Sequence, residues 1–430
     1  MSRRRLGMDW GLVLALAGAA MGALPAARSQ EHLINAPEPS QPIKEHALPD
    51  RLPAKPSQPP AFSVPVEALG FAAPGPLYLG QQNSLVSLDF LDEDHLLFTF
   101  RVPGLMRREE GASDARRIRA VVLELPSGTV GAEALWTVHD RARYLWMLKD
   151  GRFLLRDREN LESGDKTLQL KPFLHFPGAL LWLEIDPAQQ YMVTGTREPA
   201  SADGALSDLP ARSSAPDLAL RILRRDSGQV LLTSRVRSAL HLPINSDGYL
   251  ESLRGTENEW LLNLNYFSGG SRILARIDSA CSPLFDFVGP REILATYCSP
   301  AGAGEMALIT DNGRRLWQVQ TSEMAVWPLV VKAPDGSRMA REALAVTHAV
   351  TASSPLGQED IKGQLVEVLD TADGKVELET EASPVFDAGG NVAISPSGQR
   401  VAVLNGGAIQ IFELPAPPPL PQPVARPVLH

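Results

Sequence analysis

The stretch "TVHDRARYLW", from Thr137 to Trp146, combines an imidazole, a carboxylate and two guanidinium groups within five consecutive residues. A guanidinium group can donate two parallel hydrogen bonds to a carboxylate or a phosphate. The pattern is compatible with a site for an acidic ligand. The structural alternative is an ion pair between the carboxylate and an arginine that joins neighbouring elements. The four candidate residues are His139, Asp140, Arg141 and Arg143.

A second group of basic residues lies upstream, in the stretch "RVPGLMRREEGASDARR". If both groups shared one face, they would form a basic patch that attracts an acidic partner. The alternative is that the neighbouring acidic residues neutralise these arginines and leave a mixed, solvated surface. The candidate partner-binding residues in this stretch are Arg107, Arg108, Arg116 and Arg117.

Motifs for metal or covalent catalysis are missing from the sequence. The eight histidines have no His-x-x-x-His spacing, and neither a Gly-x-Ser-x-Gly nor a Gly-x-x-x-x-Gly-Lys motif occurs. "SGDK" (Ser163–Lys166) has the Ser-x-x-Lys spacing of some acyl-enzymes but lies in a polar loop rather than on a helix. "DEDH" (Asp92–His95) lacks the Gly and the distant Glu of a calcium loop, so a solvated turn is the better interpretation. The sequence therefore predicts no metal and no cofactor.

The elements that would hold these residues are short β-strands joined in pairs by tight turns. Apolar residues alternate along each run, as in a half-buried strand. Pro, Gly and Asp occupy the turns, because Pro presets φ, Gly accepts a positive φ, and Asp caps the turn with its side chain. Seven such hairpins recur, at Ser87–Phe100, Tyr144–Asp157, Leu180–Thr196, Tyr249–Asn265, Pro283–Tyr297, Trp327–Val346 and Asn391–Leu404.

A second β-rich pair follows most of these hairpins, as at Ile118–Trp136, Leu218–Val236 and Gly363–Glu381. Four antiparallel strands in about 35 to 60 residues, repeated along the chain, have the period of propeller blades. We therefore expect an all-β fold, a β-propeller of seven blades with four antiparallel strands each.

The turns also resemble the signature of a known family. "SPSGQRVAV" (Ser395–Val403) and "APDGSRMA" (Ala333–Ala340) are similar to the Ser-Pro-Asp-Gly-Lys-x-hydrophobic-Ala hairpin of WD-repeat-like bacterial propellers, and "DPAQQYMV" (Asp186–Val193) is a looser copy. The Trp-Asp dipeptide and the Gly-His pair of true WD repeats are missing, so the chain resembles the divergent members, among them uncharacterised exported propellers. The resemblance spans residues 62–414 and implies fold and export, but no activity.

The seventh blade is one strand short, because proline-rich sequence follows "AIQIFEL" (Ala408–Leu414). An open blade would expose a long unpaired edge, which proteins avoid. "FSVPVEALGF" (Phe62–Phe71), just before the first blade, is compatible with a strand. We expect this segment to close the ring as the outermost strand of the last blade, where Pro65 is tolerated on an edge.

Cys281 and Cys298, the two cysteines of the chain, flank the fifth hairpin. A two-residue loop at Gly289–Pro290 would pair Val288 with Arg291. The two cysteines would then lie directly opposite each other, at a spacing that admits a disulfide. An even cysteine count in an exported chain favours the bridge, and two buried thiols are the alternative.

Four long insertions follow the second strands of their blades, at residues 101–117, 158–166, 197–217 and 351–362. In a propeller these connections share a face with the connection that contains His139 and Arg143. Loops on a rigid scaffold carry function more often than the scaffold does. This loop-rich face is therefore the predicted binding surface.

Both ends of the chain fall outside the predicted propeller, which spans residues 61–414. Residues 1–29 have the layout of a secretory signal, with arginines followed by an apolar run from Trp10 to Ala27. An uncleaved membrane anchor is the alternative. Residues 30–60 form a proline-rich linker and residues 415–430 a proline-rich tail. We expect cleavage, which would leave no stable transmembrane span and a periplasmic or secreted protein.

The charge of the chain bears on its partners. Lys and Arg number 41 and Asp and Glu 50, and without residues 1–29 these counts become 37 and 49, a net charge of −12. Such a chain has no electrostatic footprint for nucleic acid. The sequence predicts a non-catalytic binding or scaffold module in the cell envelope or outside the cell, with a protein or an acidic ligand on the loop-rich face. The alternative is a propeller enzyme, a lyase or hydrolase acting on carbohydrate or peptide, with its site in the central channel. Clustered, inward-facing histidine and acidic residues would favour that enzyme.

Overall fold

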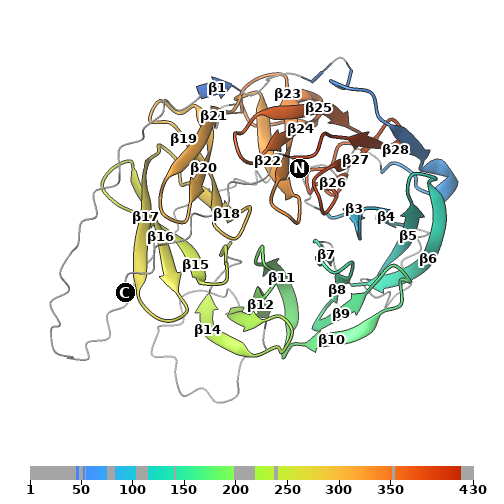
Figure 1. The fold of residues 1–430 in the computed structure, drawn as a ribbon, viewed down its shortest axis with the longest axis horizontal. Coiled ribbons are helices and arrows are strands. Elements are labelled where there is room, and N and C mark those ends of the chain that lie inside the picture. Colours follow the sequence, from blue (N-terminus) through green and yellow to red (C-terminus); the bar gives the residue numbers. More distant parts are fainter. Residues whose placement is uncertain are drawn as a thin grey trace, which may run out of the picture. The chain divides into compact units, whose positions relative to one another are not determined.

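The architecture is a ring of seven β-sheets, observed in a computed structural model of the chain (Figure 1). The structure describes residues 45–47, 52–53, 55–74, 83–102, 115–139, 142–197, 218–236, 241–350 and 354–417. These residues all belong to one compact unit, Pro39–His430. The predicted signal segment, residues 1–29, and residues 418–430 of the predicted tail lie outside the described residues.

The seven sheets follow one another along the chain and form the seven blades that the sequence predicts. Blade 1 consists of β3 (Val86–Phe90), β4 (His95–Arg101), β5 (Arg116–Glu124) and β6 (Thr129–Val138). Blade 2 consists of β7 (Leu145–Met147), β8 (Phe153–Asp157), β9 (Asn160–Gly164) and β10 (Lys171–His175). Blade 3 consists of β11 (Ala179–Ile185), β12 (Tyr191–Arg197), β13 (Leu218–Arg224) and β14 (Val230–Val236). The first strand of each of these blades lies nearest the centre of the ring (Figure 1).

The later blades repeat this plan with additions from the N-terminal segment. Blade 5 consists of β18 (Leu284–Phe287), β19 (Glu292–Cys298), β20 (Gly304–Thr310) and β21 (Arg315–Gln320), with β1 (Glu45–Ala47) added in parallel to β21. Blade 6 consists of β22 (Ala325–Lys332), β23 (Arg338–Val346), β24 (Ile361–Asp370) and β25 (Val376–Ala382). Blade 7 consists of β26 (Val392–Ile394), β27 (Arg400–Asn405), β28 (Ala408–Glu413) and β2 (Phe62–Pro65).

Blade 4 differs from the sequence prediction. Its three regular strands are β15 (Gly248–Arg254), β16 (Glu259–Tyr266) and β17 (Ser271–Asp278). The predicted inner hairpin, Tyr249–Asn265, therefore supplies the second and third strands. The inner position belongs to the irregular segment from His241 to Asn245, which pairs with β15 through one bridge, Ile244 to Tyr249, and the hydrogen bond from Leu250 N–H to Pro243 C=O (2.8 Å). Pro243 has no N–H to donate, which explains why this strand is irregular.

Segment 62–71 closes the ring as predicted. β2 pairs antiparallel with β28, so that Val64 lies opposite Ile409. The strand is shorter than expected, because a 3-10 helix, η1 (Glu67–Leu69), follows and ends at Gly70 with a φ of 79°. Phe71 then packs its ring at 5.5 Å from that of Phe98 in blade 1. The segment thus joins the last blade to the first.

Part of the predicted linker, residues 30–60, contacts the outer strands of the propeller. β1 pairs with β21 in blade 5. Further along the chain, Ser57 N–H donates to Glu379 C=O in blade 6 (2.9 Å), and Ala61 N–H donates to Ile411 C=O in blade 7 (2.8 Å). The described residues between 45 and 61 therefore follow three successive blades on their outer side.

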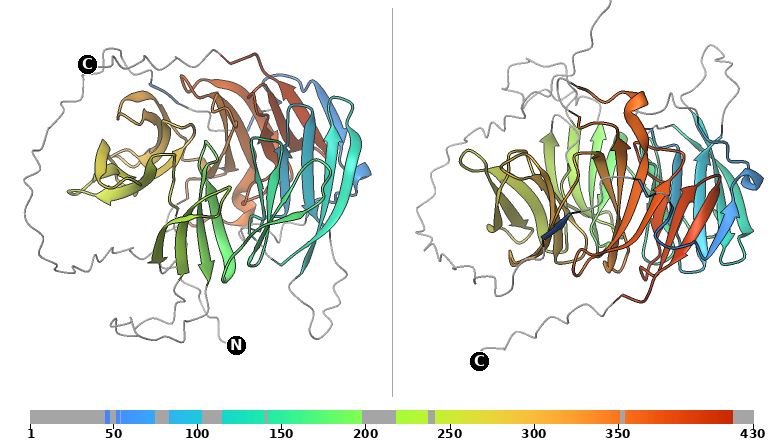
Figure 2. Two further views of the ribbon diagram at one scale, coloured as in Figure 1. Left: turned by 60° about the horizontal axis from the view of Figure 1, so that its bottom comes forward. Right: turned by 90° about the horizontal axis from the view of Figure 1, so that it is seen from above.

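The hydrophobic core lies between neighbouring blades, which stand side by side around the ring (Figure 2). One cluster combines Leu88 and Phe98 of blade 1 with Ala402 and Ile409 of blade 7. Strand alternation produces this packing, because residues i and i+2 of a strand face the same side. Each blade therefore depends on its neighbours for its core.

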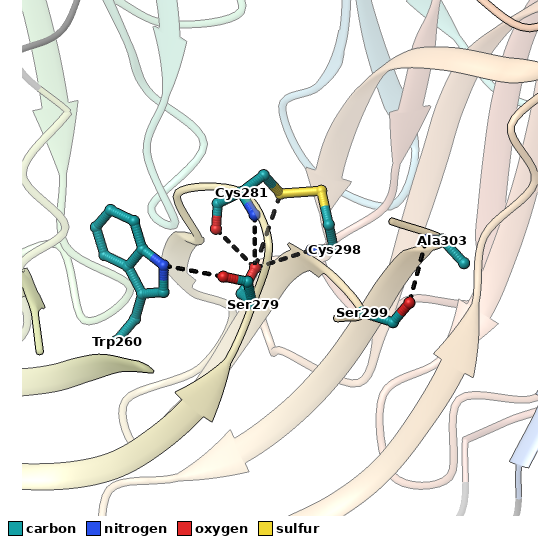
Figure 3. The surroundings of a disulfide bond; sticks show 6 residues. All are labelled: Trp260, Ser279, Cys281, Cys298, Ser299 and Ala303. Carbon is teal, nitrogen blue, oxygen red and sulfur yellow. Dashed lines mark hydrogen bonds between the residues drawn. A yellow bond between two sulfur atoms is a disulfide. The ribbon is translucent and has the colours of Figure 1, made fainter. Parts of the chain in front are cut away.

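Cys281 and Cys298 form the predicted disulfide, with Cα atoms 5.5 Å apart (Figure 3). The predicted register is wrong by one residue, because Val288 N–H donates to Glu292 C=O and the turn holds three residues instead of two. Cys281 instead precedes β18. Ser279 Oγ organises the site, since it donates to Cys281 C=O (2.6 Å) and accepts from Cys298 N–H (3.1 Å).

Candidate functional site

Acidic residues recur at one position of the first strands. In three blades a backbone N–H closes the turn that follows the first strand. The donor is Leu91 in blade 1, Asp186 in blade 3 and Val288 in blade 5. The residues two positions earlier are acidic: Asp89, Glu184 and Asp286.

These carboxylates lie on the side of the first strand that faces the next blade, since Glu184 meets His241 of blade 4 and Asp286 meets Lys332 of blade 6. In β18 the rings of Phe285 and Phe287 are buried, while Leu284 and Asp286, which alternate with them, keep access to solvent. In β3 Asp89 likewise alternates with buried apolar residues. Because the first strands lie nearest the axis (Figure 1), the acidic side chains meet the next blade close to it.

A chain of ion pairs connects four consecutive blades near the axis. His241 Nδ1, in blade 4, contacts Glu184 Oε1 of blade 3 at 3.0 Å. His241 Nε2 contacts the carbonyl oxygen of Phe285 in blade 5 at 2.8 Å. Lys332 Nζ, in blade 6, donates to Asp286 Oδ2 of blade 5 at 2.5 Å. We call Glu184, His241, Asp286 and Lys332 the axial ion-pair chain.

His241 is the charged centre of this chain. Burial lowers the pKa of His241, but the hydrogen bond and charge of Glu184 and the charge of Asp286 outweigh it and raise the pKa to about 9. The ring is therefore an imidazolium near neutral pH, and its two N–H groups donate to Glu184 and Phe285. Both ring nitrogens are thus committed to the protein.

A second axial cluster lies in blades 1 and 2. Ser87 Oγ donates to Asp89 Oδ2 at 2.5 Å. Burial raises the pKa of Asp89 to about 6, although the Ser87 hydrogen bond and the charge of Arg143 lower it. The Arg143 guanidinium lies over the Trp146 ring, 5.4 Å from its centroid, and Nε donates to Leu145 C=O at 2.9 Å.

Two large apolar side chains are exposed on neighbouring first strands. Trp327 is 50% exposed and Leu284 is 63% exposed. Trp327 has a φ of 52° and lies where the register of β22 with β23 shifts, between Val326 and Leu329. Both residues lie near the start of their strands. At this end of each blade the first strand begins and the second strand ends. We call it the loop end.

The predicted site residues that the structure describes also lie at the loop end. Arg116 and Arg117 begin β5, and Arg116 lies opposite Val138, the last residue of β6. His139 follows β6 and is held by Asp157, which accepts from His139 N–H at 2.8 Å and contacts Nδ1 at 3.0 Å. Arg143 precedes β7. The other predicted residues, Asp140, Arg141, Arg107 and Arg108, lie outside the described residues.

One of the four predicted insertions is wrong. Residues 158–166 contain strand β9, because Asp157 already pairs with Asn160 across a two-residue turn. Arg158 makes this turn possible with a φ of 53°. The polar residues of this segment are typical of a loop, but in the structure their side chains alternate along a strand. The other three insertions lie partly outside the described residues.

Sequence reasoning missed most of the axial residues. Their signal is an acidic residue enclosed by apolar residues just before a turn, as in "LDF" (Leu88–Phe90), "LEI" (Leu183–Ile185) and "FDF" (Phe285–Phe287). Aligning the seven hairpins on their turns reveals this recurrence. His241, a basic partner of these carboxylates, has no comparable sequence signal, because it belongs to an irregular strand.

Comparison with known proteins assigns neither a family nor an activity to this chain. No protein-family model and no curated protein matches the chain. Similar solved structures include a chain of the mitotic checkpoint complex, with 11% identity over 90% of this chain and 99% of that chain (TM-score 0.45). The WD40 domain of Toxoplasma gondii coronin has 9% identity over 88% and 90% of the two chains (TM-score 0.46). TolB from Acinetobacter baumannii has 14% identity over 71% and 78% (TM-score 0.36). The predicted propeller is confirmed by the strand order of the seven sheets.

The described residues contain neither a cluster suited to a metal ion nor a helix suited to a membrane. Within this part of the chain no group of three or more His, Cys, Asp or Glu side chains is arranged to hold a metal ion. Among the same residues, no helix has the length and apolar character needed to cross a membrane.

Proposed function

We propose that this propeller is a non-catalytic binding module that takes a protein or an acidic ligand at the loop end, close to the axis. The observation that carries the proposal is Trp327. An exposed indole has a left-handed backbone conformation within a bulge of the innermost strand. Such a conformation costs about 1–3 kcal/mol for a residue other than Gly, and bulges of this kind re-aim side chains at functional sites.

The surroundings of Trp327 fit a partner with both apolar and charged groups. Leu284 is exposed on the neighbouring first strand. Asp286 and Lys332 follow on the same two strands and form an ion pair. Tryptophan is enriched among the residues that dominate binding energy at interfaces, especially when polar groups surround it.

The axial histidine and carboxylates also bear on the alternative, a lyase or hydrolase. A general acid or base must be able to exchange a proton with the substrate. His241 donates from both ring nitrogens to the protein, which favours a role as a clamp between blades. Asp89 is the group that keeps the enzyme alternative open, because its pKa of about 6 suits proton transfer.

We also propose that the protein is exported and works in the periplasm or outside the cell. The Cys281–Cys298 disulfide supports this, because disulfides persist in oxidising compartments. N-terminal sequencing of the protein recovered from its native cells tests the proposal. A mature chain that begins at residue 30 in the periplasm or medium agrees with it, and an intact N-terminus in the cytoplasm contradicts it.

The binding proposal is tested by crosslinking and capture from the periplasm or medium with two variants. Trp327→Ala removes the proposed anchor, whereas Leu135→Ala removes an equally exposed side chain from the outer strand of blade 1. We expect Trp327→Ala to lose the crosslinked partner with little change in melting temperature, and Leu135→Ala to retain it. Equal capture by both variants would contradict the assignment of the surface.

A further inference from the structure

The guanidinium group of Arg143 is held in a fixed orientation. Its Nε donates to the carbonyl oxygen of Leu145 at 2.9 Å. Its central carbon lies 5.4 Å from the centroid of the Trp146 ring, a cation–π contact. A backbone hydrogen bond at one edge and an aromatic ring under one face leave little freedom to the planar group. Its geometry is therefore preorganised, which reduces the entropy that a ligand must overcome.

The remaining donors of this group are available. Arg143 is exposed to solvent. In the part of the chain that the structure describes, its terminal nitrogens Nη1 and Nη2 donate to no acceptor, and Nε makes the hydrogen bond. Two terminal nitrogens of one guanidinium form an end-on fork whose geometry matches the two oxygens of a carboxylate.

Asp89 acts on Arg143 through its charge and not as a hydrogen-bonded partner. Its Oδ2 accepts from Ser87 Oγ at 2.5 Å. Burial lowers the pKa of Arg143, and the charge of Asp89 raises it in part. Asp89 therefore acts on the guanidinium through its charge, while the terminal nitrogens keep access to solvent.

We propose that Arg143 is the anion-recognition residue of the loop end, and that the ligand or partner presents a carboxylate there. This inference rests on the proposed binding function, for which it names the chemistry of the ligand. The site consists of the Arg143 fork, the Trp146 ring beneath it and Asp89 beside it. A guanidinium fork also binds tetrahedral oxyanions, but the charge of Asp89 beside it repels a dianion such as sulfate more than a monocarboxylate, so acetate and sulfate probes separate the two.

The site has a dependence on pH that follows from Asp89. Four groups face this carboxyl or act on it: Ser87, Arg143, Tyr144 and, through Tyr144, Arg101. Tyr144 stays neutral, because burial raises its pKa to about 12 while its hydroxyl pairs with Thr99 Oγ1 at 2.8 Å. Ionised Asp89 repels an incoming anion, so anion affinity increases as the pH falls from 7.5 to 5.5 through the pKa of about 6.

Isothermal titration of the purified protein with acetate and with sulfate tests the proposal. We expect wild type to bind acetate more tightly than sulfate, with a Kd below about 10 mM, and Arg143→Gln to weaken acetate binding at least about tenfold. Arg143→Lys keeps the charge but not the two parallel donors, so it should also bind acetate more weakly than wild type. Arg272→Gln, on the exposed outer strand of blade 4, is the matched control and should bind as wild type does.

An Asp89 variant and partner capture by Arg143→Gln provide two further tests. Asp89→Asn should bind acetate more tightly at pH 7.5 and lose the pH dependence. Acetate binding that is absent from wild type, or equal in Arg143→Gln, overturns the proposal. A partner that is captured through Trp327 by both wild type and Arg143→Gln would also overturn it, while leaving the proposed binding function intact.

Discussion

At the scale of single residues, the most unusual group is the carboxyl of Glu342 in β23. It is 1% exposed and accepts one hydrogen bond, from Gln364 Nε2 to Oε2 at 2.8 Å. Asn391 Nδ2 donates to Gln364 Oε1 at 2.8 Å and orients this amide. Oε1 of Glu342 has no partner among the described residues. Burial raises the pKa of Glu342 to about 8, which the Gln364 hydrogen bond only partly offsets.

The first prediction concerns the pH dependence of stability. The unfolded chain releases this proton near pH 4.5, whereas the folded chain holds it to about pH 8. The stabilising contribution is therefore fully present below pH 4.5 and is lost as the pH rises through 8. We expect Glu342→Gln to raise the melting temperature by a few degrees at pH 8.5 and to change it little at pH 4.5. Thermal denaturation of both proteins across this range measures the difference.

An exposed acidic residue supplies the control for this experiment. Glu359, in the 3-10 helix η3 (Gln358–Asp360), is exposed, so Glu359→Gln should leave the pH profile unchanged. If Glu342→Gln lowered the melting temperature equally at pH 4.5 and pH 8.5, ionisation of Glu342 would not limit stability.

At the scale of elements, the segment that closes the ring has two parts with different partners. β2 completes blade 7, and Phe71 packs against Phe98 and Phe100 of blade 1 at 5.5 and 5.4 Å. Val66 and Leu69 are buried in the same cluster. Gly70 permits the turn between these parts, because its φ of 79° is unfavourable for other residues. The segment therefore stabilises the junction between the first and the last blade.

The second prediction compares three N-terminal truncations. Removal of residues 1–44 should leave the melting temperature unchanged. Removal of residues 1–60 should cost a few degrees, because β1 and the hydrogen bonds of Ser57 are lost. Removal of residues 1–72 should destabilise the fold strongly, since blade 7 loses its outer strand. Equal melting temperatures for the last two truncations would disprove closure by this segment.

The third prediction concerns the disulfide that joins the connection before β18 to the end of β19. The bridge closes a loop with a sequence separation of 17, and such a loop contributes about 3 kcal/mol in the chain-entropy model. We expect no free thiol in the denatured, unreduced protein, and a lower melting temperature for Cys281→Ser combined with Cys298→Ser. Two titratable thiols in protein from its native compartment would contradict the bridge.

At the scale of the whole molecule, the blades are joined near the axis by charge as well as by apolar packing. The axial ion-pair chain runs from Glu184 through His241 and Asp286 to Lys332. Each of the four residues comes from a different blade, so no blade satisfies these groups alone. The four side chains are partly accessible to solvent, so bulk salt weakens their interactions. The chain thus acts as a clamp across blades 3 to 6.

The fourth prediction is a loss of this clamp at alkaline pH. Because the folded state raises the pKa of His241 from 6.5 to about 9, the stabilisation is fully present below pH 6.5 and is lost as the pH rises through 9. Hydrogen exchange of the strands in blades 3 to 5 should therefore accelerate between pH 7 and pH 9.5, after correction for the intrinsic rate. His241→Gln should exchange faster at pH 7 and lose this additional dependence. His175→Gln, which alters an exposed histidine, is the control.

Local sequence was sufficient for the blade plan. Alternating apolar residues and turns such as Lys149–Asp150–Gly151, where Gly151 has a φ of 75°, depend on neighbours in the chain. All seven predicted hairpins occur, and the closing strand was predicted from an unpaired edge. Blade 4 was misassigned because Pro243 interrupts the alternation of its inner strand. The predicted register after Val288 was wrong by one residue, because the same sequence is compatible with a turn of two or of three residues.

By itself, therefore, the sequence determined the repeated hairpins, the closure of the ring and the pairing of the two cysteines, since each depends on strand alternation, turn chemistry or short separation. Only the tertiary structure decided which charges meet at the axis. Glu184 and His241 are 57 residues apart, and Lys332 and Asp286 are 46 apart. Their contacts exist because ring closure brings successive first strands around one axis. A charge pattern along one strand carries no information about which partner the next blade supplies.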